Sequence, residues 1–563
     1  MGEDNAVMRL TRTLALFVAL SVPACFAGNI SPDLEQQLPQ LGLFSSTNVI
    51  VQLNVPLVSP LVNQVLLTGT QVVAQLPLVN GLLCTVSGLQ IRLLSSLPIV
   101  SYISPDRSLA GALDYAEPAV NANLAMQYGW TGSGVGVAVI DSGIAPVADL
   151  TYNGTGLSRI VHSENFADQS GNTSDQYGHG THVAGILAGD GAASTGSWYT
   201  RTFTGIAPAA EIVNLRVLNG QGQGTDSAVI RAIFRAIQLK SQYNIRVINL
   251  SLGRPVYETY LLDPLCLAVE AAWKAGIVVV VAAGNDGRDN SSGENGYGTI
   301  NSPGNDPAVI TVGAMKTMFT VTRADDLIAS YSSKGPTAYD NIVKPDIVAP
   351  GNLMVSLLAP NSWLSVNYPQ NDVPDAYYES GSVLGNSTSY YRLSGTSMAT
   401  PVVSGAAALL LQQNPGLTPD EIKLRLMKTA TKNFPASSVA TDPTTGATYT
   451  SYYDVFTVGS GYIDVWAALN DSTVAYGSAR SPQASYNPLT EIASFAVDQT
   501  SVFVNNPVWG GNTVGGSSAR FNVVWGGGNP IMGSNVVWGS NVVWGSSNNI
   551  AAESANAAIY GEN

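Results

Sequence analysis

Three short motifs, in the chain order Asp, His, Ser, contain side chains that could cooperate in nucleophilic catalysis. Asp141 ends an apolar run, and His179 begins a stretch of small residues that is typical of a helix start. Ser397 lies at another predicted helix start, with Pro401 in the first turn. A serine hydroxyl is a weak nucleophile at neutral pH and needs an adjacent base. An imidazole is an effective base where a buried carboxylate fixes its tautomer and stabilises the imidazolium that forms. The three motifs therefore indicate a nucleophile, its base and an orienting carboxylate.

A fourth motif places an amide side chain after a strongly apolar run. Ile277–Ala283 is followed by Gly284 and then by Asn285. The Asn285 amide and the backbone N–H of Ser397 could both donate to the oxyanion of a tetrahedral intermediate. This chemistry is acyl transfer.

Each of these residues also has a plainer interpretation. His179 and His182 form an H-x-x-H pair that could bind zinc, but the chain has three histidines in all, the third being His162. A zinc site would need all three or a carboxylate, so His182 is expected to be a structural residue of its helix. Ser397 alone would be interpreted as a helix cap and Asp141 as a turn residue, and their joint occurrence favours catalysis.

The elements that must position these residues follow an α/β pattern. The continuous apolar runs are predicted strands, and the segments between them carry helical patterns, one near Leu265–Lys274 and another that Asp226 is expected to cap. Such strands imply a mostly parallel sheet covered by helices on both faces, with its chemistry at the carboxyl ends of the strands. The runs are Val135–Ile140, Ile212–Val217, Val247–Leu252 and Ile277–Ala283.

The glycines from Gly132 to Gly136 do not indicate dinucleotide binding. They precede the first of these strands, so a phosphate would meet no helix N-terminus there. The charge of the chain also excludes a phosphate-tracking nucleic-acid binder, because the formal net charge is −14. With 45% hydrophobic residues and 11% charged residues the chain is too apolar to be disordered.

The N-terminal residues 1–27 are predicted to be a secretory signal peptide. Arg9 and Arg12 precede the apolar stretch Leu14–Val22, and small residues end it at Ala27. The stretch is too short to cross a bilayer, and no other segment approaches the length of a transmembrane span. We therefore expect secretion, the alternatives being a periplasmic location or a lipid anchor at Cys25.

Residues 28–109 read as a small α+β module. Strands are predicted at 48–53, 82–86 and 99–103, with a helix near 90–97. A predicted turn at 105–107 ends this module. About 80 residues suffice for a modest hydrophobic core.

The motifs resemble those of the subtilisin-like serine proteases, in which the catalytic residues come in the same order. Four further blocks, at 249–253, 331–336, 344–351 and 459–465, are similar to family segments. The resemblance implies a three-layer α/β peptidase domain over residues 110–472. It implies that residues 28–109 are an intramolecular inhibitory propeptide, released by self-cleavage between Arg107 and Leu113.

The resemblance also implies individual roles. Ser397 would attack the scissile bond of a protein or peptide, His179 would act as base and then acid, Asp141 would orient His179, and Asn285 would bind the oxyanion. With no acidic residue in the segments that would form the pocket walls, an apolar or aromatic side chain is expected in the primary pocket. The pocket walls would be Ser251, Leu252, Gly253, Ala283 and Gly284.

No cofactor is expected for this chemistry, although a structural calcium ion is compatible with the family. Asp149 lies where many relatives have a calcium ligand, but the sequence offers no full ligand set, because calcium takes six to eight oxygens. Cys266, within an apolar helical run, is expected to be inert core.

Two segments depart from the family pattern. Residues 352–393 are a polar insertion that could shape substrate subsites or form a surface loop. Residues 473–563 form a low-charge tail in which an Asn-Val-Val-Trp-Gly unit recurs at 506–510, 522–526, 535–539 and 541–545. The tail could pack on the peptidase domain, bind a surface or remain flexible. A catalytically inactive subtilisin fold that acts through this tail is the rival function.

Overall fold

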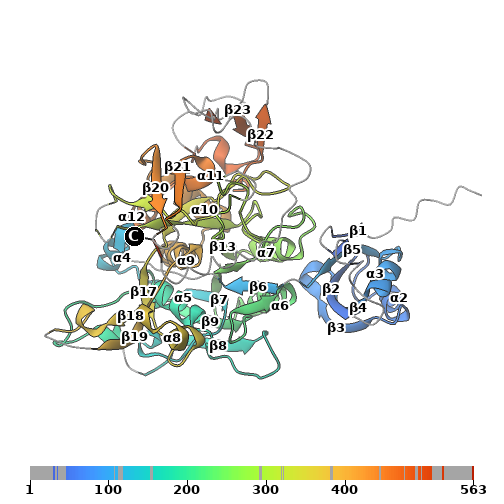
Figure 1. Cartoon of the computed structure of the whole chain (residues 1–563), viewed down its shortest axis with the longest axis horizontal. Coiled ribbons are helices and arrows are strands. Elements are labelled where there is room, and N and C mark those ends of the chain that lie inside the picture. The colour runs from blue at the N-terminus through green and yellow to red at the C-terminus, as the bar shows by residue number, and fades with distance from the viewer. Residues whose placement is uncertain are drawn as a thin grey trace, which may run out of the picture. The chain divides into compact units, whose positions relative to one another are not determined.

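The chain forms two compact units, Met1–Asp106 and Arg107–Asn563 (Figure 1). The predicted signal peptide and Cys25 lie outside the residues that the computed structural model describes. Those residues are 29–31, 34–35, 38, 46–106, 108–111, 118–152, 156–290, 295–318, 320, 323–380, 385–442, 446–474, 476–487, 492–495, 497–506, 508–509, 523–524 and 561–562. No helix among them is long and apolar enough to span a membrane.

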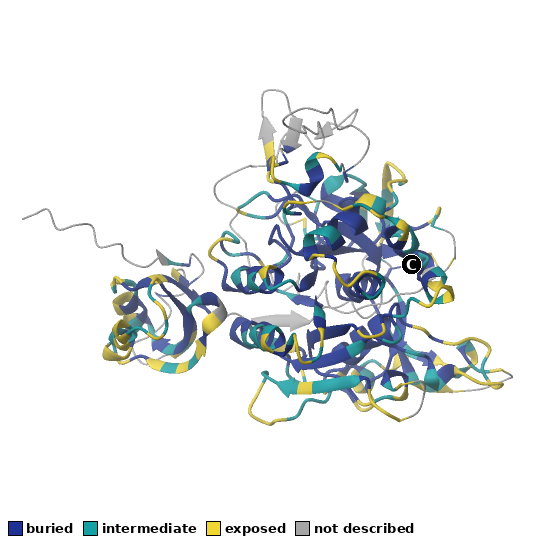
Figure 2. Ribbon diagram, turned by 180° about the vertical axis from the view of Figure 1, so that it is seen from behind, coloured by how far each residue is buried: buried dark blue, intermediate teal, exposed yellow. Residues whose placement is uncertain are grey.

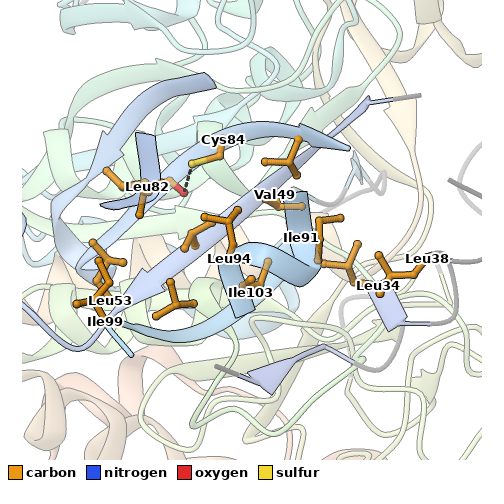
Figure 3. Packing of buried hydrophobic residues seen from close by; sticks show 14 residues of the cluster. Leu34, Leu38, Val49, Leu53, Leu82, Cys84, Ile91, Leu94, Ile99 and Ile103 are labelled. Atoms are coloured by element: carbon orange, nitrogen blue, oxygen red, sulfur yellow. Dashed lines mark hydrogen bonds between the residues drawn. The ribbon is translucent and has the colours of Figure 1, made fainter. Parts of the chain in front are cut away.

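The first unit is the predicted α+β module. Its five strands pair in the order β1-β5-β2-β4-β3, and Ile91 and Leu94 of the helix α3 pack into the core with Val49 and Ile103 (Figure 3). A capping box starts α3, since the Ser87 side chain accepts from the backbone N–H of the third helical residue while that residue's side chain accepts from the Ser87 N–H. The elements are β1 (Asn29–Ile30), β2 (Ser46–Leu53), α2 (Asn63–Leu67), β3 (Gln71–Leu76), β4 (Gly81–Ser87), α3 (Gly88–Ser95) and β5 (Val100–Pro105).

The second unit is built on an eight-stranded sheet whose central strands are buried (Figure 2). The order is β15-β14-β13-β11-β7-β9-β8, with β16 also paired to β14, and every pairing is parallel except that of β15. The strands are β7 (Gly136–Asp141), β8 (Ile160–Asn165), β9 (Glu211–Arg216), β11 (Ile245–Leu250), β13 (Val278–Ala282), β14 (Ile310–Lys316), β15 (Leu327–Ile328) and β16 (Ile347–Pro350). The predicted α/β fold and its four runs are confirmed.

The helices around the sheet pack in two groups. From β7 the chain crosses to β8 at the edge of the sheet, returns through α5 (His179–Ala188) to β9, and then passes through α6 (Asp226–Leu239) to β11 on the other side of β7. The helix α5 contacts α9 (Thr396–Gln413), while α6 contacts α7 (Pro264–Lys274). In α/β folds, ligands bind at the carboxyl ends of the strands.

Two local predictions about the helices are wrong. Thr225, and not Asp226, caps α6, since the Thr225 side chain accepts from the backbone N–H of Ala228 while the Asp226 carboxylate binds Arg254. Pro401 was expected in the first turn of its helix, but it lies inside α9 (Thr396–Gln413). This position of Pro401 changes the hydrogen bonding at the start of α9.

Smaller elements surround the sheet. The insertion 352–393 is not a loose loop, because its strands form the sheet β17-β19-β18, and β17 contacts α5. The remaining helices are α4 (Ala122–Gln127), α7 (Pro264–Lys274), α8 (Trp363–Asn367), α10 (Pro419–Thr429), α11 (Val455–Val458) and α12 (Val465–Asn470). The remaining strands are β6 (Ser108–Gly111), β10 (Gln223–Thr225), β12 (Leu252–Gly253), β17 (Met354–Leu357), β18 (Asp372–Pro374), β19 (Asn386–Leu393), β20 (Ser437–Thr441), β21 (Thr448–Tyr452), β22 (Ala484–Asn487), β23 (Ile492–Phe495) and β24 (Val523–Val524).

The predicted boundary at 473 does not separate two compact units. Val508 and Trp509, from the first tail repeat, are buried in one hydrophobic cluster with Leu424, Met427 and Phe456, and all five residues belong to the second unit. From the second repeat, β24 pairs with β23. The copies at 535–539 and 541–545 lie outside the described residues.

Candidate active site

Asp141 and His179 form a buried hydrogen-bonded pair at the carboxyl end of β7. His179 is the first residue of α5, and its Nδ1 lies 2.7 Å from Asp141 Oδ1. Since an ionised carboxylate only accepts, Nδ1 carries the proton and Nε2 is left as the basic nitrogen. His179 Nε2 makes no hydrogen bond within the described part of the chain. The imidazole therefore has the tautomer that a general base requires.

Ser397 is held to the residue that precedes β12 by two hydrogen bonds. Its Oγ donates to the carbonyl of Ser251 at 3.1 Å, and the Ser251 Oγ donates to the carbonyl of Ser397 at 2.5 Å. The second bond is available because Pro401 has no N–H with which to bond that carbonyl four residues earlier in α9. Pro401 thus leaves the Ser397 carbonyl free to accept from the Ser251 hydroxyl, and this bond fixes the start of α9.

Asn285 lies beside the same helix start. Its Oδ1 accepts from the backbone N–H of Thr396 at 2.8 Å and from the Thr396 hydroxyl at 3.2 Å. These bonds fix the rotation of the amide and leave Nδ2 as the group that can donate. The four predicted catalytic residues are all buried and come from the ends of β7 and β13 and the starts of α5 and α9.

A short strand pairs with the segment that directly follows Ser251. β6 is the middle strand of an antiparallel sheet, with β10 on one side and β12 on the other. In the register, Ala110 pairs with Gly253 and Gly111 pairs with Leu252. The edges of β10 and β12 thus hold an extended segment by backbone pairing, the arrangement by which a peptide is bound through strand addition.

Comparisons with known proteins agree with this arrangement. The model of the subtilase family matches residues 132–447. Serine protease AprX of Bacillus subtilis (strain 168) is 41% identical over 346 residues, which are 60% of this chain and 71% of that protein. Subtilisin DY of Bacillus licheniformis is 33% identical over 324 residues, 57% of this chain and 93% of its own length. Subtilisin E of Bacillus subtilis (strain 168) is 34% identical over 367 residues, 64% and 78% of the two chains.

The chain belongs to the subtilase family. This subtilase is a subtilisin-like serine endopeptidase that acts on protein substrates. The resemblance drawn from the sequence motifs is therefore confirmed.

The predicted pocket segments of the subtilase lie against residues that the sequence analysis left out. Gly284 has φ +109°, and a Cβ there would lie 2.7 Å from both Asn301 Nδ2 and Ser333 Oγ, so only glycine fits. Asn301 Nδ2 in turn donates to the Asp286 carboxylate at 3.1 Å. An acidic group thus borders the pocket segments, and the expected apolar preference stays a prediction.

Asp175 is a positioning residue that sequence reasoning missed. Its buried carboxylate accepts from the backbone N–H groups of Gly178 and Thr181, at the start of α5, and from the hydroxyl of Ser142. Ser142 directly follows Asp141, so Asp175 ties the start of the histidine helix to the end of β7. Burial raises the pKa of Asp175, against these hydrogen bonds. Its signal in the sequence is only an aspartate four residues before His179.

The insertion also contacts the segment before His179. The backbone N–H groups of Trp363 and Leu364 in α8 donate to the carbonyls of Gln176 and Tyr177, and the Trp363 ring stacks on that of Tyr177 at 5.8 Å. The insertion therefore holds in place the segment that directly precedes His179.

The histidine pair of α5 does not form a metal site. His182 Nε2 lies 3.1 Å from the carbonyl oxygens of Met354 and of Tyr391, while His179 faces Asp141. No group of three or more His, Cys, Asp or Glu residues that could hold a metal ion occurs among the described residues. His182 is the structural residue that was expected.

The surroundings of Asp149 do not fit a calcium ion. One carboxylate oxygen accepts from the Ala193 N–H at 2.6 Å and the other from the Tyr390 hydroxyl at 2.9 Å. These are hydrogen-bond donors, whereas calcium requires a cage of oxygen acceptors. Burial raises the pKa of Asp149, which also disfavours a carboxylate charged and ready for a cation. Calcium elsewhere in the chain stays a prediction.

Proposed function

We propose that Ser397, His179, Asp141 and Asn285 carry out the hydrolysis through an acyl-enzyme. His179 Nε2 removes the proton from Ser397 Oγ as that oxygen attacks the scissile carbonyl, and it then protonates the leaving amine. Asp141 stabilises the imidazolium through the Nδ1 hydrogen bond. Asn285 Nδ2 and the N–H of Ser397 donate to the oxyanion. Water, activated by His179, releases the acyl group.

The observation that carries this proposal is the 2.7 Å bond between His179 and Asp141. It supports a proton on Nδ1 and therefore a basic Nε2, and the proposed nucleophile is the second residue of α9. In the described structure Ser397 Oγ is bonded to Ser251, so attack requires the hydroxyl to rotate from that carbonyl toward His179.

We further propose that the chain cleaves itself between Ala112 and Leu113. Gly111 pairs with Leu252, and a substrate bound in this register would place its next residue opposite Ser251, whose carbonyl accepts from the nucleophile. In the sequence the residue after Gly111 is Ala112, so we expect attack at the bond between Ala112 and Leu113. This site lies within the interval between Arg107 and Leu113 expected from the sequence, and it makes residues 28–112 the released propeptide.

The same proposal includes export and inhibition. A signal peptide at 1–27 would direct secretion, with periplasmic location or lipid attachment at Cys25 as the alternatives. The propeptide would inhibit until it is removed, because β6 occupies the strand positions on β10 and β12 that a substrate needs.

The test compares the full chain with its Ser397→Ala variant. We expect the unaltered chain to yield a product that begins at Leu113 by amino-terminal sequencing, to digest casein and to form a serine-directed phosphonate adduct on Ser397. The variant should remain a full-length precursor. If no adduct forms and casein stays intact, the catalytic assignment is refuted. Normal trimming of the variant would mean that another protease cuts the chain.

The rival function, an inactive fold that binds through its tryptophan-rich tail, has little support from the first repeat. Trp509 is packed against Phe495 and Phe503 and is buried, so it is unavailable to a ligand.

A further inference from the structure

Glu562 occupies a buried pocket of the peptidase unit that no catalytic role explains. Its side chain is 3% exposed, and Oε1 lies 2.7 Å from Arg288 Nη2 while Oε2 lies 3.3 Å from Lys316 Nζ. The backbone N–H of Ser330 donates to both carboxylate oxygens at 3.0 and 3.2 Å, and its hydroxyl donates to Oε1. Two buried cations and two neutral donors thus surround one carboxylate.

The pocket also recognises the backbone of this residue. Asn352 Nδ2 donates to the Glu562 carbonyl at 2.7 Å, and the Glu562 N–H donates to Asn352 Oδ1 at 2.9 Å. A single amide side chain therefore pairs with both backbone groups, as a neighbouring β-strand would. This pairing requires a peptide and would not be made by a free carboxylic acid.

The surroundings of the preceding residue, Gly561, leave no room for a side chain. Gly561 has φ +64°, and a Cβ on it would lie 2.4 Å from Leu353 Cδ2 and 2.5 Å from Ser394 Oγ. Both distances are shorter than real side chains tolerate, and the backbone conformation itself favours glycine. The pocket therefore fits the dipeptide Gly-Glu and excludes most others.

An empty pocket would be unfavourable for the peptidase unit. Arg288 is nearly fully buried, and with the pocket empty it would keep Asp442, at 3.1 Å, but lose Glu562 as its second anion, which is costly for a buried cation. Burial and charge together thus argue that this site is normally filled.

We propose that Arg288, Lys316, Ser330 and Asn352 form a binding site for a Gly-Glu peptide segment, and that its occupant is Gly561–Glu562 of the same chain. The site fastens the region that follows the tryptophan repeats to the peptidase unit beside Ser394, three residues before the nucleophile. Tyr331 connects the proposed site with the start of α9. Its hydroxyl donates to the carbonyl of Gly351, next to Asn352, at 2.8 Å and accepts from the N–H of Gly395 at 3.1 Å.

The test uses the full chain with Ser397→Ala, so it does not depend on the proposed catalysis. Amide hydrogen exchange of Ser330, which donates to Glu562, is measured by mass spectrometry in added Glu562→Ala and Gly561→Ala variants. Glu553→Ala is the matched control, because it removes the same charge from the same tail. We expect exchange at least five-fold faster in the first two variants and unchanged in the control. Less than five-fold in either variant, or equal acceleration in the control, would overturn the proposal.

Rescue with a peptide tests the site itself. A peptide with the sequence of residues 557–563 is added to the Glu562→Ala protein at about millimolar concentration, the effective concentration of a tethered segment. It should restore protection of Ser330, and the same peptide with alanine at the Gly561 position should not. No rescue by the first peptide, or equal rescue by both, would refute a site that reads Gly-Glu.

Discussion

His182 makes the stability of the peptidase unit depend on pH, and the size of the effect follows from its burial. The imidazole is fully buried in α5, where Nε2 donates to two carbonyls, those of Met354 and Tyr391. Burial, with a smaller contribution from His179, lowers the pKa of His182 from 6.5 to about 3. The folded protein therefore keeps this imidazole neutral at pH values where an unfolded chain protonates it.

The sign of the effect follows from these two values. Above pH 6.5 His182 is neutral in both states and adds nothing to the pH dependence. As the pH falls from 6.5 toward 3, the unfolded state takes up a proton that the folded state excludes, so the free energy of unfolding falls. From pH 7 to pH 5 the loss through His182 is roughly 2 kcal/mol, and from pH 7 to pH 4 roughly 3 kcal/mol.

Urea unfolding at pH 7 and pH 5 measures this loss. The protein is the full chain with Ser397→Ala, compared with the same protein carrying His182→Gln or, as a control, His162→Gln. Glutamine at 182 keeps an N–H donor for the two carbonyls but does not titrate. All nine tryptophans lie after Asp106, so tryptophan fluorescence reports on the peptidase unit alone.

We expect the His182→Gln protein to lose about 2 kcal/mol less between pH 7 and pH 5 than its parent, while His162→Gln controls for the replacement of an imidazole elsewhere in the same unit. Only the difference between variants is used, because other buried groups titrate in all three; burial raises the pKa of Asp306, for example, to about 7. If the three proteins lose the same stability to within about 0.5 kcal/mol, the buried neutral state assigned to His182 is wrong.

Three further predictions concern other residues. Asn285→Ala should lower kcat by about 10²–10³ with a small change in KM, a magnitude taken from the equivalent donor in subtilisin; an unchanged kcat on a peptide substrate would remove Asn285 from the oxyanion site. Peroxide should inactivate the enzyme as the buried Met398 thioether becomes a polar sulfoxide, and Met398→Leu should resist; activity that persists with Met398 shown by mass spectrometry to be oxidised would contradict this. Asp149→Asn should cost about 1–3 kcal/mol in urea unfolding, equally with excess calcium and with a chelator, because its partners are protein donors; a cost that appears only with calcium would show a bound ion.

The strands and the order of the catalytic motifs could be predicted because their signals are local. The segment Val278–Ala282 is apolar throughout, as a strand covered on both faces must be, and Asp141 and Asn285 follow such runs closely. Both parallel strands end at the same edge of the sheet, so the approach of these side chains to each other follows from the topology alone.

Other features depend on partners that are distant in the sequence. Asp226 has a cap-forming side chain, but Arg254 binds it from another element, so Thr225 takes over the cap. Asp175 carries no motif, and its role appears only when β7 and α5 are brought together. Glu562 pairs with Arg288 across 274 positions, a separation that no periodicity reveals.

The mutual bonds between Ser251 and Ser397 restrict how substrate preference could be redesigned. Ser251 is predicted to line the primary pocket and would be an obvious place to change selectivity. Its hydroxyl, however, donates to the carbonyl of Ser397, and its own carbonyl accepts from the Ser397 hydroxyl. Replacing Ser251 would therefore change turnover and selectivity together. A screen for altered selectivity at this position would also select changes in turnover. Asn301, which borders Gly284 and whose amide donates to Asp286, is the better position for a library.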